Sequence, residues 1–572
     1  MAQDRRHVFQ PPRGITRRQF LAASAASGVF WTLAGCGPGR HLISARPPLD
    51  IIIKGGSVLD GTGAPERLEN IGVRDGKVVV LGNLESAEAG LVIDAGGLKV
   101  CPGFIDIHSH VDTSLFSNPY AESKVRQGVT TEVSGMDGES PAPVGGLTAD
   151  RTLAAFREEF GFDCPYRDMD GYFNLLQKER TAQNVVSFVG LGTIRENVVG
   201  VENRPATAEE MAAMQREVRQ AIEQGCWGVS TGLEYTPGSY ASTEELWLLT
   251  KAAPEPYRIY ATHLRNEADT GLEALAEAIV IARNSGARLQ VSHLKAQNKR
   301  NWGMQARALE MLEEAIDSGL EVHADRYPYV AFSTSLSSLF PLWCREGGVE
   351  RFLARLRDPV QLPRIKEDVQ AKVDGLSSWD AVMITAVSSD ESRRYQGKTV
   401  QQIATQEHVD PFEFTVDLLV KENGRCEMVG FGMDEAGTEM VLAWKNTMVC
   451  SDAGAYSPRS TSRPHPRAYG SFPRAIALYQ RQRKIVSLPE MVRKMTSLPA
   501  RKLGLTDRGV IAAGKSADLV LFDYEKIEDR ATYLEPHQFP TGIPYVLVNG
   551  VAVVDRGNQT EALPGAVLRS SA

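Results

Sequence analysis

Short apolar segments alternate with amphipathic segments along most of the chain, from about residue 100 onward. Each amphipathic segment ends at a glycine that directly precedes the next apolar run, as at Gly128, Gly225, Gly286 and Gly319. Short apolar runs are typical of buried strands, and apolar residues spaced three and four apart are typical of helices. Glycine is the usual residue just after a helix. The pattern therefore predicts a repeating strand–helix unit.

Eight such units follow one another. The expected strands are residues 103–110, 129–135, 184–190, 227–232, 258–264, 288–294, 321–327 and 446–452. Thr207 and Thr270 each begin a Thr-x-x-Glu motif, which predicts a capping box at the start of a helix. Eight strand–helix units predict an α/β fold, a (β/α)8 TIM barrel over residues 101–499, with reactive side chains at the carboxyl ends of its strands.

Both ends of the chain, and one long interval within it, carry different patterns. Alternating apolar residues interrupted by Asn-Gly and Asp-Gly occur on both sides of the barrel, which predicts hairpins. We expect these to form a small β-sandwich domain from residues 49–100 and 500–572. The interval between the seventh and eighth strands, about 340–445, has helical patterns of its own and predicts an inserted subdomain.

The first 36 residues have the pattern of an export signal. Arg17 and Arg18 precede a short stretch of small and apolar residues that ends in Leu-Ala-Gly-Cys36. This stretch is too short to span a membrane. The paired arginines resemble a twin-arginine signal, and the last four residues resemble a bacterial lipobox, which would attach a lipid to Cys36. We expect residues 37–48 to be a linker and the protein to be exported and anchored at the periplasmic or outer face of a bacterial membrane. The alternative is an ordinary frayed N-terminus.

Composition narrows the possible partners. The chain is 42% hydrophobic and 23% charged with a net charge of −8, and it has no long basic run, which argues against a nucleic-acid partner. Without residues 1–35 it has 58 basic and 70 acidic residues, a net charge of −12, so it would need a lipid to stay on an anionic membrane. Six further cysteines are scattered with no Cys-x-x-Cys pair, so we expect buried thiols at 101, 164, 226, 344, 426 and 450.

Four of the ten histidines fall at the carboxyl ends of predicted strands, together with two aspartates. His108 and His110 are two residues apart, so both side chains lie on one face of the first strand. Imidazole and carboxylate are ligands that zinc takes, so the pattern predicts a site for one or two zinc ions. The candidate ligands are His108, His110, Asp137, His263, His293 and Asp452. We interpret His323, His408, His465 and His537 as structural.

These motifs resemble a known family. Residues 103–110 (GFIDIHSH) resemble the opening strand of the amidohydrolase superfamily, and residues 508–520 resemble its closing small domain. Shorter segments are similar to D-aminoacylases, the N-acyl-D-amino-acid deacylases: STGLEY at 230–235, SHLK at 292–295, YPY at 327–329, Ser451-Asp452, and HPRAYGSFPR at 465–474. The resemblance covers about residues 50–560. It implies a metal-dependent hydrolase that cleaves N-acyl-D-amino acids into a D-amino acid and a carboxylate.

The turn after the second strand departs from the family pattern. Members of this type commonly carry a zinc-binding cysteine there, whereas this chain has Gly135-Met136-Asp137-Gly138. A hard carboxylate in place of a soft thiolate predicts a less tightly held ion, or one shared with a second metal. Other superfamily members bridge two metals with a carboxylated lysine after strand four, where this chain has none, so Asp137 is the better candidate bridge. The alternative is a solvent-facing Asp137 with Glu139 as the ligand.

The ligand set implies hydrolysis by water. Zinc lowers the pKa of a bound water to about 7 and polarises a carbonyl, so no serine or cysteine nucleophile is needed. Asp452 is the candidate catalytic base, which would take the proton of the water and pass it to the departing amine.

Substrate recognition is inferred from the same resemblance. In the family resembled, a lysine at the position of Lys295 pairs with the substrate carboxylate, and carboxylates attract charge-assisted donors. The expected helpers are Tyr327, Tyr329, Ser333 and Arg467. Because no basic residue lies between Ser333 and Arg345, we expect neutral or apolar D-amino acids as substrates.

Two other functions remain open. The first is another cyclic-amide or dipeptide amidohydrolase, dihydroorotase-like or isoaspartyl-dipeptidase-like, against which the missing strand-four lysine counts. The second is an exported lipoprotein that only binds its ligand. That function predicts a damaged metal site, whereas every expected position holds a competent ligand. In each case the partner is a small molecule, and the sequence does not indicate the oligomeric state.

Overall fold

The computed structural model describes residues 49–571, and Cys36 with the expected export signal and linker lies outside the described residues. All eight expected barrel strands are present, and their residues are almost completely buried. They are β6 (Phe104–Asp106), β7 (Val129–Ser134), β8 (Asn184–Ser187) with its continuation β9 (Val189–Gly190), β10 (Val229–Gly232), β11 (Ile259–His263), β12 (Arg288–Val291), β13 (Val322–Arg326) and β17 (Thr447–Val449).

The barrel strands are all parallel and form two ladders, β6-β7-β8 and β9-β10-β11-β12-β13-β17. The first and eighth strands meet just beyond their ends. The N–H of Asp452 donates to the His108 carbonyl at 2.8 Å, and the N–H of His110 donates to the Ala453 carbonyl at 3.2 Å. These bonds bring the ends of β6 and β17 together, so their functional side chains share one mouth of the (β/α)8 barrel.

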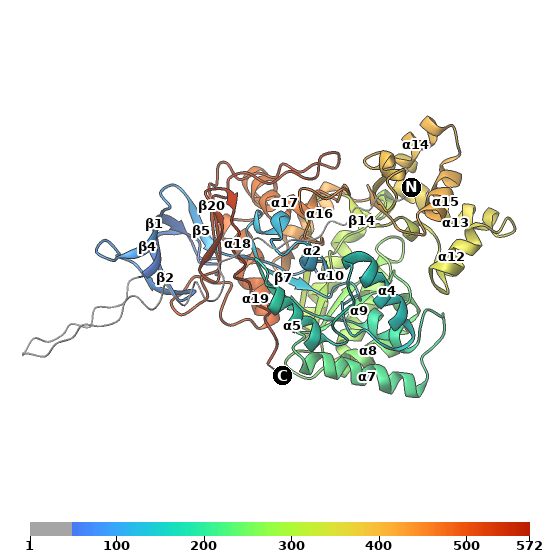
Figure 1. The fold of residues 1–572 in the computed structure, drawn as a ribbon, viewed down its shortest axis with the longest axis horizontal. Helices are drawn as coiled ribbons and strands as arrows, with labels where there is room; N and C mark the ends of the chain where they lie inside the picture. The colour runs from blue at the N-terminus through green and yellow to red at the C-terminus, as the bar shows by residue number, and fades with distance from the viewer. Residues whose placement is uncertain (1–48, 572) are drawn as a thin grey trace, which may run out of the picture. The chain divides into compact units, whose positions relative to one another are not determined.

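Helices follow the strands, drawn from cyan to orange in Figure 1. They are α5 (Met169–Glu179), α6 (Leu191–Val198), α7 (Ala208–Glu223), α8 (Thr243–Lys251), α9 (Gly271–Ser285), α10 (Met304–Asp317), α16 (Glu435–Ala443) and α18 (Leu488–Met495). Thr207 forms the predicted capping box with Glu210 at the start of α7. The capping box predicted at Thr270 is wrong: its backbone lies at φ −112°, ψ 30°, away from the extended geometry of a capping residue, and its side chain forms no capping bond. Gly286 ends α9 at φ 71°, as expected of a C-terminal glycine.

Further helices complete the barrel region. They are α2 (Ser114–Ser117), α3 (Glu122–Val125), α4 (Ala149–Phe160), α17 (Arg467–Arg474), which continues into a π-helix at Ala475–Gln482, and α19 (Ser497–Leu503). The helix α17 directly follows the eighth strand and its loop, so it carries Arg467 to the carboxyl end of the barrel.

A nine-stranded sheet combines both termini of the described chain. Its strands are β1 (Leu49–Val58), β2 (Arg67–Arg74), β3 (Lys77–Leu81), β4 (Ala89–Asp94), β5 (Lys99–Pro102), β18 (Leu519–Phe522), β19 (Tyr545–Val548), β20 (Val551–Asp555) and β21 (Asn558–Gln559). The strand β5 pairs with β1 on one side and with β18 on the other, which joins the two termini. Buried side chains from both termini, including Ile53, Val73 and Leu519, form one apolar cluster.

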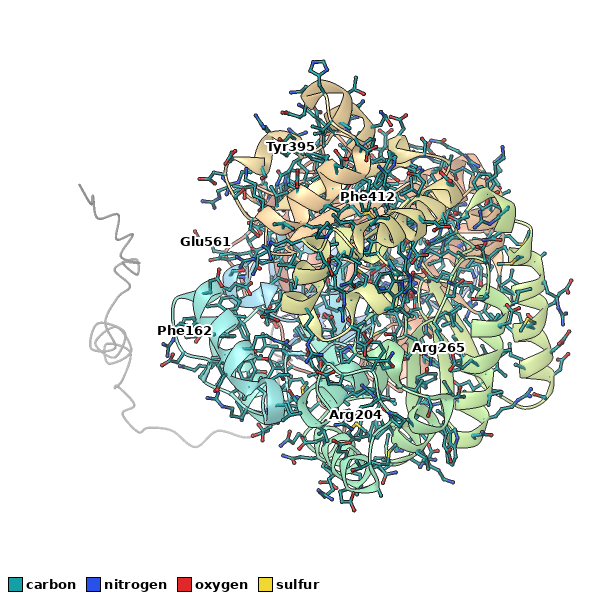
Figure 2. All side chains as sticks on the ribbon, turned by 90° about the vertical axis from the view of Figure 1, so that its right-hand side faces the viewer. Phe162, Arg204, Arg265, Tyr395, Phe412 and Glu561 are labelled. Carbon is teal, nitrogen blue, oxygen red and sulfur yellow. The ribbon has the colours of Figure 1, made fainter. Side chains whose placement is uncertain are left out.

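The interval between β13 and β17 forms a subdomain with its own core, coloured yellow to orange in Figure 1. Its antiparallel sheet has the order β14 (Phe332–Ser335), β16 (Cys426–Gly430), β15 (Val382–Val387). Its helices are α11 (Leu342–Arg345), α12 (Gly348–Leu356), α13 (Leu362–Leu376), α14 (Val400–Glu407) and α15 (Pro411–Lys421). Tyr395 and Phe412, labelled in Figure 2, are both buried in this core.

The six cysteines of the described residues are buried and free, which confirms the prediction of buried thiols. Within residues 49–571, no helix combines the length and the apolar character that crossing a membrane requires.

Candidate active site

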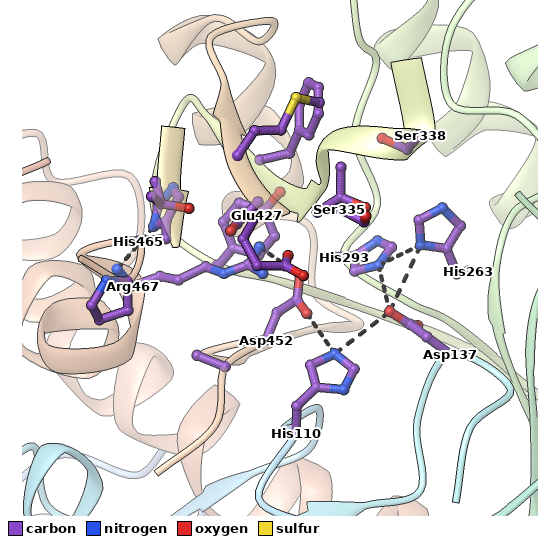
Figure 3. A pocket seen from close by; sticks show the side chains of 18 of the residues that line it. His110, Asp137, His263, His293, Ser335, Ser338, Glu427, Asp452, His465 and Arg467 are labelled. Carbon is purple, nitrogen blue, oxygen red and sulfur yellow. Dashed lines mark hydrogen bonds and ion pairs between the residues drawn. The ribbon is translucent and has the colours of Figure 1, made fainter. Parts of the chain in front are cut away.

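The six predicted metal ligands meet at the carboxyl ends of the barrel strands. Ligand atoms of His108, Asp137, His293 and Asp452 all lie within 4.8 Å of one another. Those of His263, Glu267 and His293 form a second, three-residue group within the same distance. His110 adjoins the first group, with its Nε2 3.0 Å from an Asp452 oxygen. The two groups share His293 and lie at the base of a cavity of about 370 Å³ (Figure 3).

Asp137 lies among the four histidines. Its carboxylate oxygens are 3.4 Å from Nε2 of both His108 and His293, 3.6 Å from His110 and 3.7 Å from His263. The residue Asp137 is 9% exposed, and Glu139 belongs to neither ligand group. The structure thus places Asp137, and not Glu139, where a bridging ligand would be.

Tight backbone packing holds Asp137 in this position. Asp137 itself has φ 54°, and Gly135 and Gly138 on either side have φ 72° and 81°. A Cβ on Gly135 would lie 2.0 Å from the Phe188 carbonyl oxygen, and one on Gly138 would lie 2.6 Å from the Gly232 nitrogen. The turn after β7 therefore needs glycine on both sides to press against the neighbouring strands.

The electrostatics of the cluster fit a cation. Burial lowers the pKa of His108, but Asp137, Asp325 and Asp452 outweigh it and hold that pKa well above its usual value. Burial raises the pKa of Asp137, yet His108 and His293 hold it well below its usual value. Both ring nitrogens of His108 and Oδ1 of Asp137 are buried without a hydrogen-bond partner among the described residues. Buried, unpartnered nitrogen and oxygen atoms in one tight group are what a zinc site requires.

Two carboxylates behind the ligands were missing from the sequence prediction. Asp325 on β13 lies 3.3 Å from Nδ1 of His108 and accepts the N–H of His293 at 2.7 Å. Glu267 lies 3.1 Å from Nδ1 of His293. Carboxylates of this kind fix the ring orientation of metal-binding histidines. Glu267 follows His263 by four residues and Asp325 lies on the seventh strand, but only the fold shows that both side chains turn toward the site.

Asp452, the predicted base, is held by two partners. Its carboxylate contacts Nε2 of His110 at 3.0 Å and accepts from Arg467 at 2.7 Å. Burial raises its pKa, but Arg467, His108 and His293 outweigh burial and hold the pKa far below the usual range. Asp452 is therefore ionised at neutral pH.

Most predicted substrate-binding residues line the cavity, and one does not. Lys295 lies 2.6 Å from Glu267, and the hydroxyl of Tyr327 is buried with no partner among the described residues. Ser333 and Arg467 also line the cavity, and Arg467 stacks on the Tyr327 ring at 4.7 Å. Tyr329 is outside the cavity lining: its hydroxyl turns toward Pro466 and Asp529 at 3.4 and 3.5 Å. The strand β13 ends at Arg326, so Tyr329 lies in the loop beyond the strand, where the alternation of a strand does not determine the direction of the side chain.

The inserted subdomain supplies cavity residues that the sequence did not indicate. Lys372 on α13 lines the cavity and pairs with Glu234 at 3.1 Å. Glu427 on β16 of the same subdomain also lines the cavity, as does Glu139, which follows β7 of the barrel. His465 was interpreted as structural, and it does bond the Ala331 carbonyl at 3.0 Å, although it borders the cavity.

Comparisons with known proteins agree with this geometry. A model of the amidohydrolase family matches residues 448–554. The chain is 34% identical to an N-acyl-D-glutamate deacylase and 32% identical to a D-aminoacylase, both from Alcaligenes xylosoxydans xylosoxydans. The two alignments each cover 92% of this chain, with 97% of the first relative and 99% of the second.

The fold also matches a solved structure. It is similar, with a TM-score of 0.78 and 34% identity, to N-acyl-D-glutamate deacylase from Bordetella bronchiseptica complexed with zinc and a phosphonate inhibitor. That match covers 91% of this chain and all of the other. The chain belongs to the amidohydrolase family, in the branch that contains the D-aminoacylases and N-acyl-D-amino-acid deacylases.

Proposed function

We propose that this protein is a zinc-dependent hydrolase of the amide bond of N-acyl-D-amino acids. One observation carries the proposal: a group of two histidines and two aspartates, one of them the candidate base Asp452, lies at the base of a cavity that also contains Lys295, Tyr327 and Arg467. Relatives of similar length are named as deacylases of such substrates.

One set of residues binds the metal and acts on the amide bond, and another set binds the substrate. His108, His110, Asp137, His263, His293 and Asp452 would hold one or two zinc ions. A zinc ion supplies a Lewis acid for the amide carbonyl and lowers the pKa of the attacking water. Asp452 accepts the proton of the water and returns it to the amine that leaves. Arg467 holds the Asp452 carboxylate in position while this transfer takes place.

The cations and the unpartnered hydroxyl orient the substrate. Lys295 and Tyr327 direct donors into the cavity, and a substrate carboxylate is the acceptor that both fit. Every cation that lines the described cavity already has an acidic partner: Lys295 has Glu267, Lys372 has Glu234 and Arg467 has Asp452.

The test is product formation as a function of metal. Apoprotein prepared with a chelator should release no amino acid from N-acetyl-D-leucine. Addition of zinc should restore the release of D-leucine and acetate in equal amounts. Activity of a verified zinc-free preparation, or products in unequal amounts, would remove the support for this function.

We also propose that the protein is exported by the twin-arginine route and anchored through a lipid on Cys36, with the paired arginines and the Leu-Ala-Gly-Cys sequence as the support. In a bacterial host, the wild-type protein should label with a fatty acid and fractionate with membranes. The Cys36→Ser variant should remain unlabelled and soluble. Equal fractionation of both would refute the anchor.

A further inference from the structure

Two carboxyl groups of the cavity have no partner. The side chains of Glu427 and Glu139 form no hydrogen bond or ion pair with any residue of the described chain, although both line the cavity. The other acidic side chains of the lining are engaged: Asp137 and Asp452 with histidines, Glu234 with Lys372, and Glu267 with Lys295. Among the acidic side chains of the lining, Glu427 and Glu139 are therefore the ones without a countercharge.

Glu427 extends from the inserted subdomain over the metal ligands. It lies on β16, directly opposite Ser335 of β14 and Ala386 of β15, and both of these neighbours also line the cavity. Figure 3 shows its carboxylate directed into the pocket, on the side of Asp452 and Arg467. Lys372 pairs with Glu234, which in turn contacts His263 of the second ligand group. Lys372 is therefore engaged by Glu234 and forms no ion pair with Glu427 or Glu139.

The surroundings of Glu427 favour a positive charge. Glu427 and Glu139 are both exposed at the cavity surface. The enclosing walls of the cavity and the charge of Glu139 raise the pKa of Glu427 to about 7, and Arg467 and His110 only partly offset them. Two carboxylates that face the same cavity repel each other, and a cation near both of them relieves that repulsion. A ligand with a positive charge would therefore be attracted to this side of the cavity.

The cavity has an independent mark of a ligand site. The hydroxyl of Tyr327 is completely buried, lines the same cavity and has no partner among the described residues. A buried hydroxyl of this kind calls for an acceptor from outside the chain. A substrate could fit both parts of the cavity. Its carboxylate would accept from Lys295 and Tyr327, and a separate cationic group would pair with Glu427.

We propose that Glu427, with Glu139 beside it, determines specificity by binding an amine or guanidine group of the substrate. The substrates would then be N-acyl-D-amino acids that carry a positive charge in the amino-acid side chain or in the acyl group. This inference rests on the proposed deacylase function, because it assigns a second contact to the same substrate.

Matched substrate pairs test the proposal on the zinc-loaded protein at pH 8 and low salt. N-acetyl-D-lysine against N-acetyl-D-norleucine tests a cation in the side chain. β-Alanyl-D-norleucine, whose amine stays protonated at pH 8, against butyryl-D-norleucine tests a cation in the acyl group. In at least one pair, the cationic member should have a kcat/KM about tenfold higher, and added salt should reduce the ratio.

Variants locate the effect. Glu427→Gln removes the charge at nearly constant shape and should bring the ratio of the preferred pair close to one. Glu223→Gln, an exposed site on α7, removes the same charge away from the cavity and should leave the ratio unchanged. If Glu427→Gln does not fold, Glu139→Gln should lower the same ratio, and the salt dependence of the wild-type ratio provides a measurement without any variant.

The outcomes separate the two proposals. Ratios of one or below in both pairs, or a ratio that Glu427→Gln and Glu139→Gln leave intact, would overturn the role of Glu427. A preference in only the acyl pair would support it and identify the acyl group as the carrier of the charge. If none of the four substrates is hydrolysed, the proposed function itself is refuted.

Discussion

Replacement of Asp452 by asparagine separates catalysis from metal binding and from stability. The variant keeps the size of the side chain and one neutral oxygen for its neighbours, but it cannot accept a proton. Because Asp452 is the candidate base, we expect kcat to fall by about 10²- to 10⁴-fold, the usual effect of losing a general base. The remaining ligands, His108, Asp137 and His293, should still hold zinc.

The same substitution should also lower the stability of the protein, because it removes one partner of the buried Arg467–Asp452 ion pair. Arg467 and Asp452 are 7% and 6% exposed, and their atoms are 2.7 Å apart. At an effective dielectric constant of about 20, that distance corresponds to an attraction of about 6 kcal/mol. Part of the lost attraction is offset, because a neutral asparagine pays less for its burial and keeps one amide oxygen as an acceptor for Arg467. We therefore expect a net loss of about 3 kcal/mol in the free energy of unfolding, the lower end for a buried pair that loses one partner.

Three measurements on the variant distinguish the roles of Asp452 as base, metal ligand and partner of Arg467: kcat, zinc content and thermal stability. The double variant Asp452→Asn/Arg467→Met removes both charges and should recover stability relative to Asp452→Asn, while turnover stays lost. Activity of Asp452→Asn within tenfold of wild type would exclude Asp452 as the base. Loss of zinc together with activity would instead make it mainly a metal ligand.

The remaining predictions concern the metal, the substrate and pH. Asp137→Ala should lower the zinc content of the purified protein, because four imidazoles lose their shared carboxylate; an unchanged content would contradict the bridging position. Lys295→Met should raise KM for N-acetyl-D-leucine at least tenfold by removing a charge-assisted donor to the carboxylate, and an unaltered KM would exclude that contact. Burial lowers the pKa of Lys502 to about 7, against about 10.4 in an unfolded chain, so between these values the unfolded chain binds more protons and folding stability rises with pH. Thermal midpoints should therefore increase from pH 7 to 9, and Lys502→Met should flatten the increase; parallel profiles of both proteins would refute this assignment.

The barrel and its ligands could be predicted because they depend on local patterns. Buried parallel strands are short apolar runs, and a histidine at the end of such a run is placed by the strand itself. His108, His110, His263 and His293 were found in this way, and Asp137 because it directly follows a strand. The family resemblance added what these patterns cannot give, which is the amide substrate and its D-configuration.

The rest of the cavity depends on contacts between distant segments. Glu427 and Lys372 come from the inserted subdomain, and no strand pattern of the barrel indicates which of its side chains turn toward the metal ligands. Tyr327 and Tyr329 both follow the end of β13, yet only Tyr327 lines the cavity, while the hydroxyl of Tyr329 faces Pro466 and Asp529. The sequence did not indicate Asp325, because nothing near a buried aspartate inside a strand shows which groups it faces, here the N–H of His293 and the ring of His108.

The central claim is hydrolysis of the D-configured amide by the zinc-loaded protein. It is tested most directly by kcat/KM for N-acetyl-D-leucine and N-acetyl-L-leucine under identical conditions, with the free amino acid as the measured product. We predict release of D-leucine, with a kcat/KM for the D-substrate at least a hundredfold above that for the L-substrate. Hydrolysis of the L-substrate but not of the D-substrate would contradict the account.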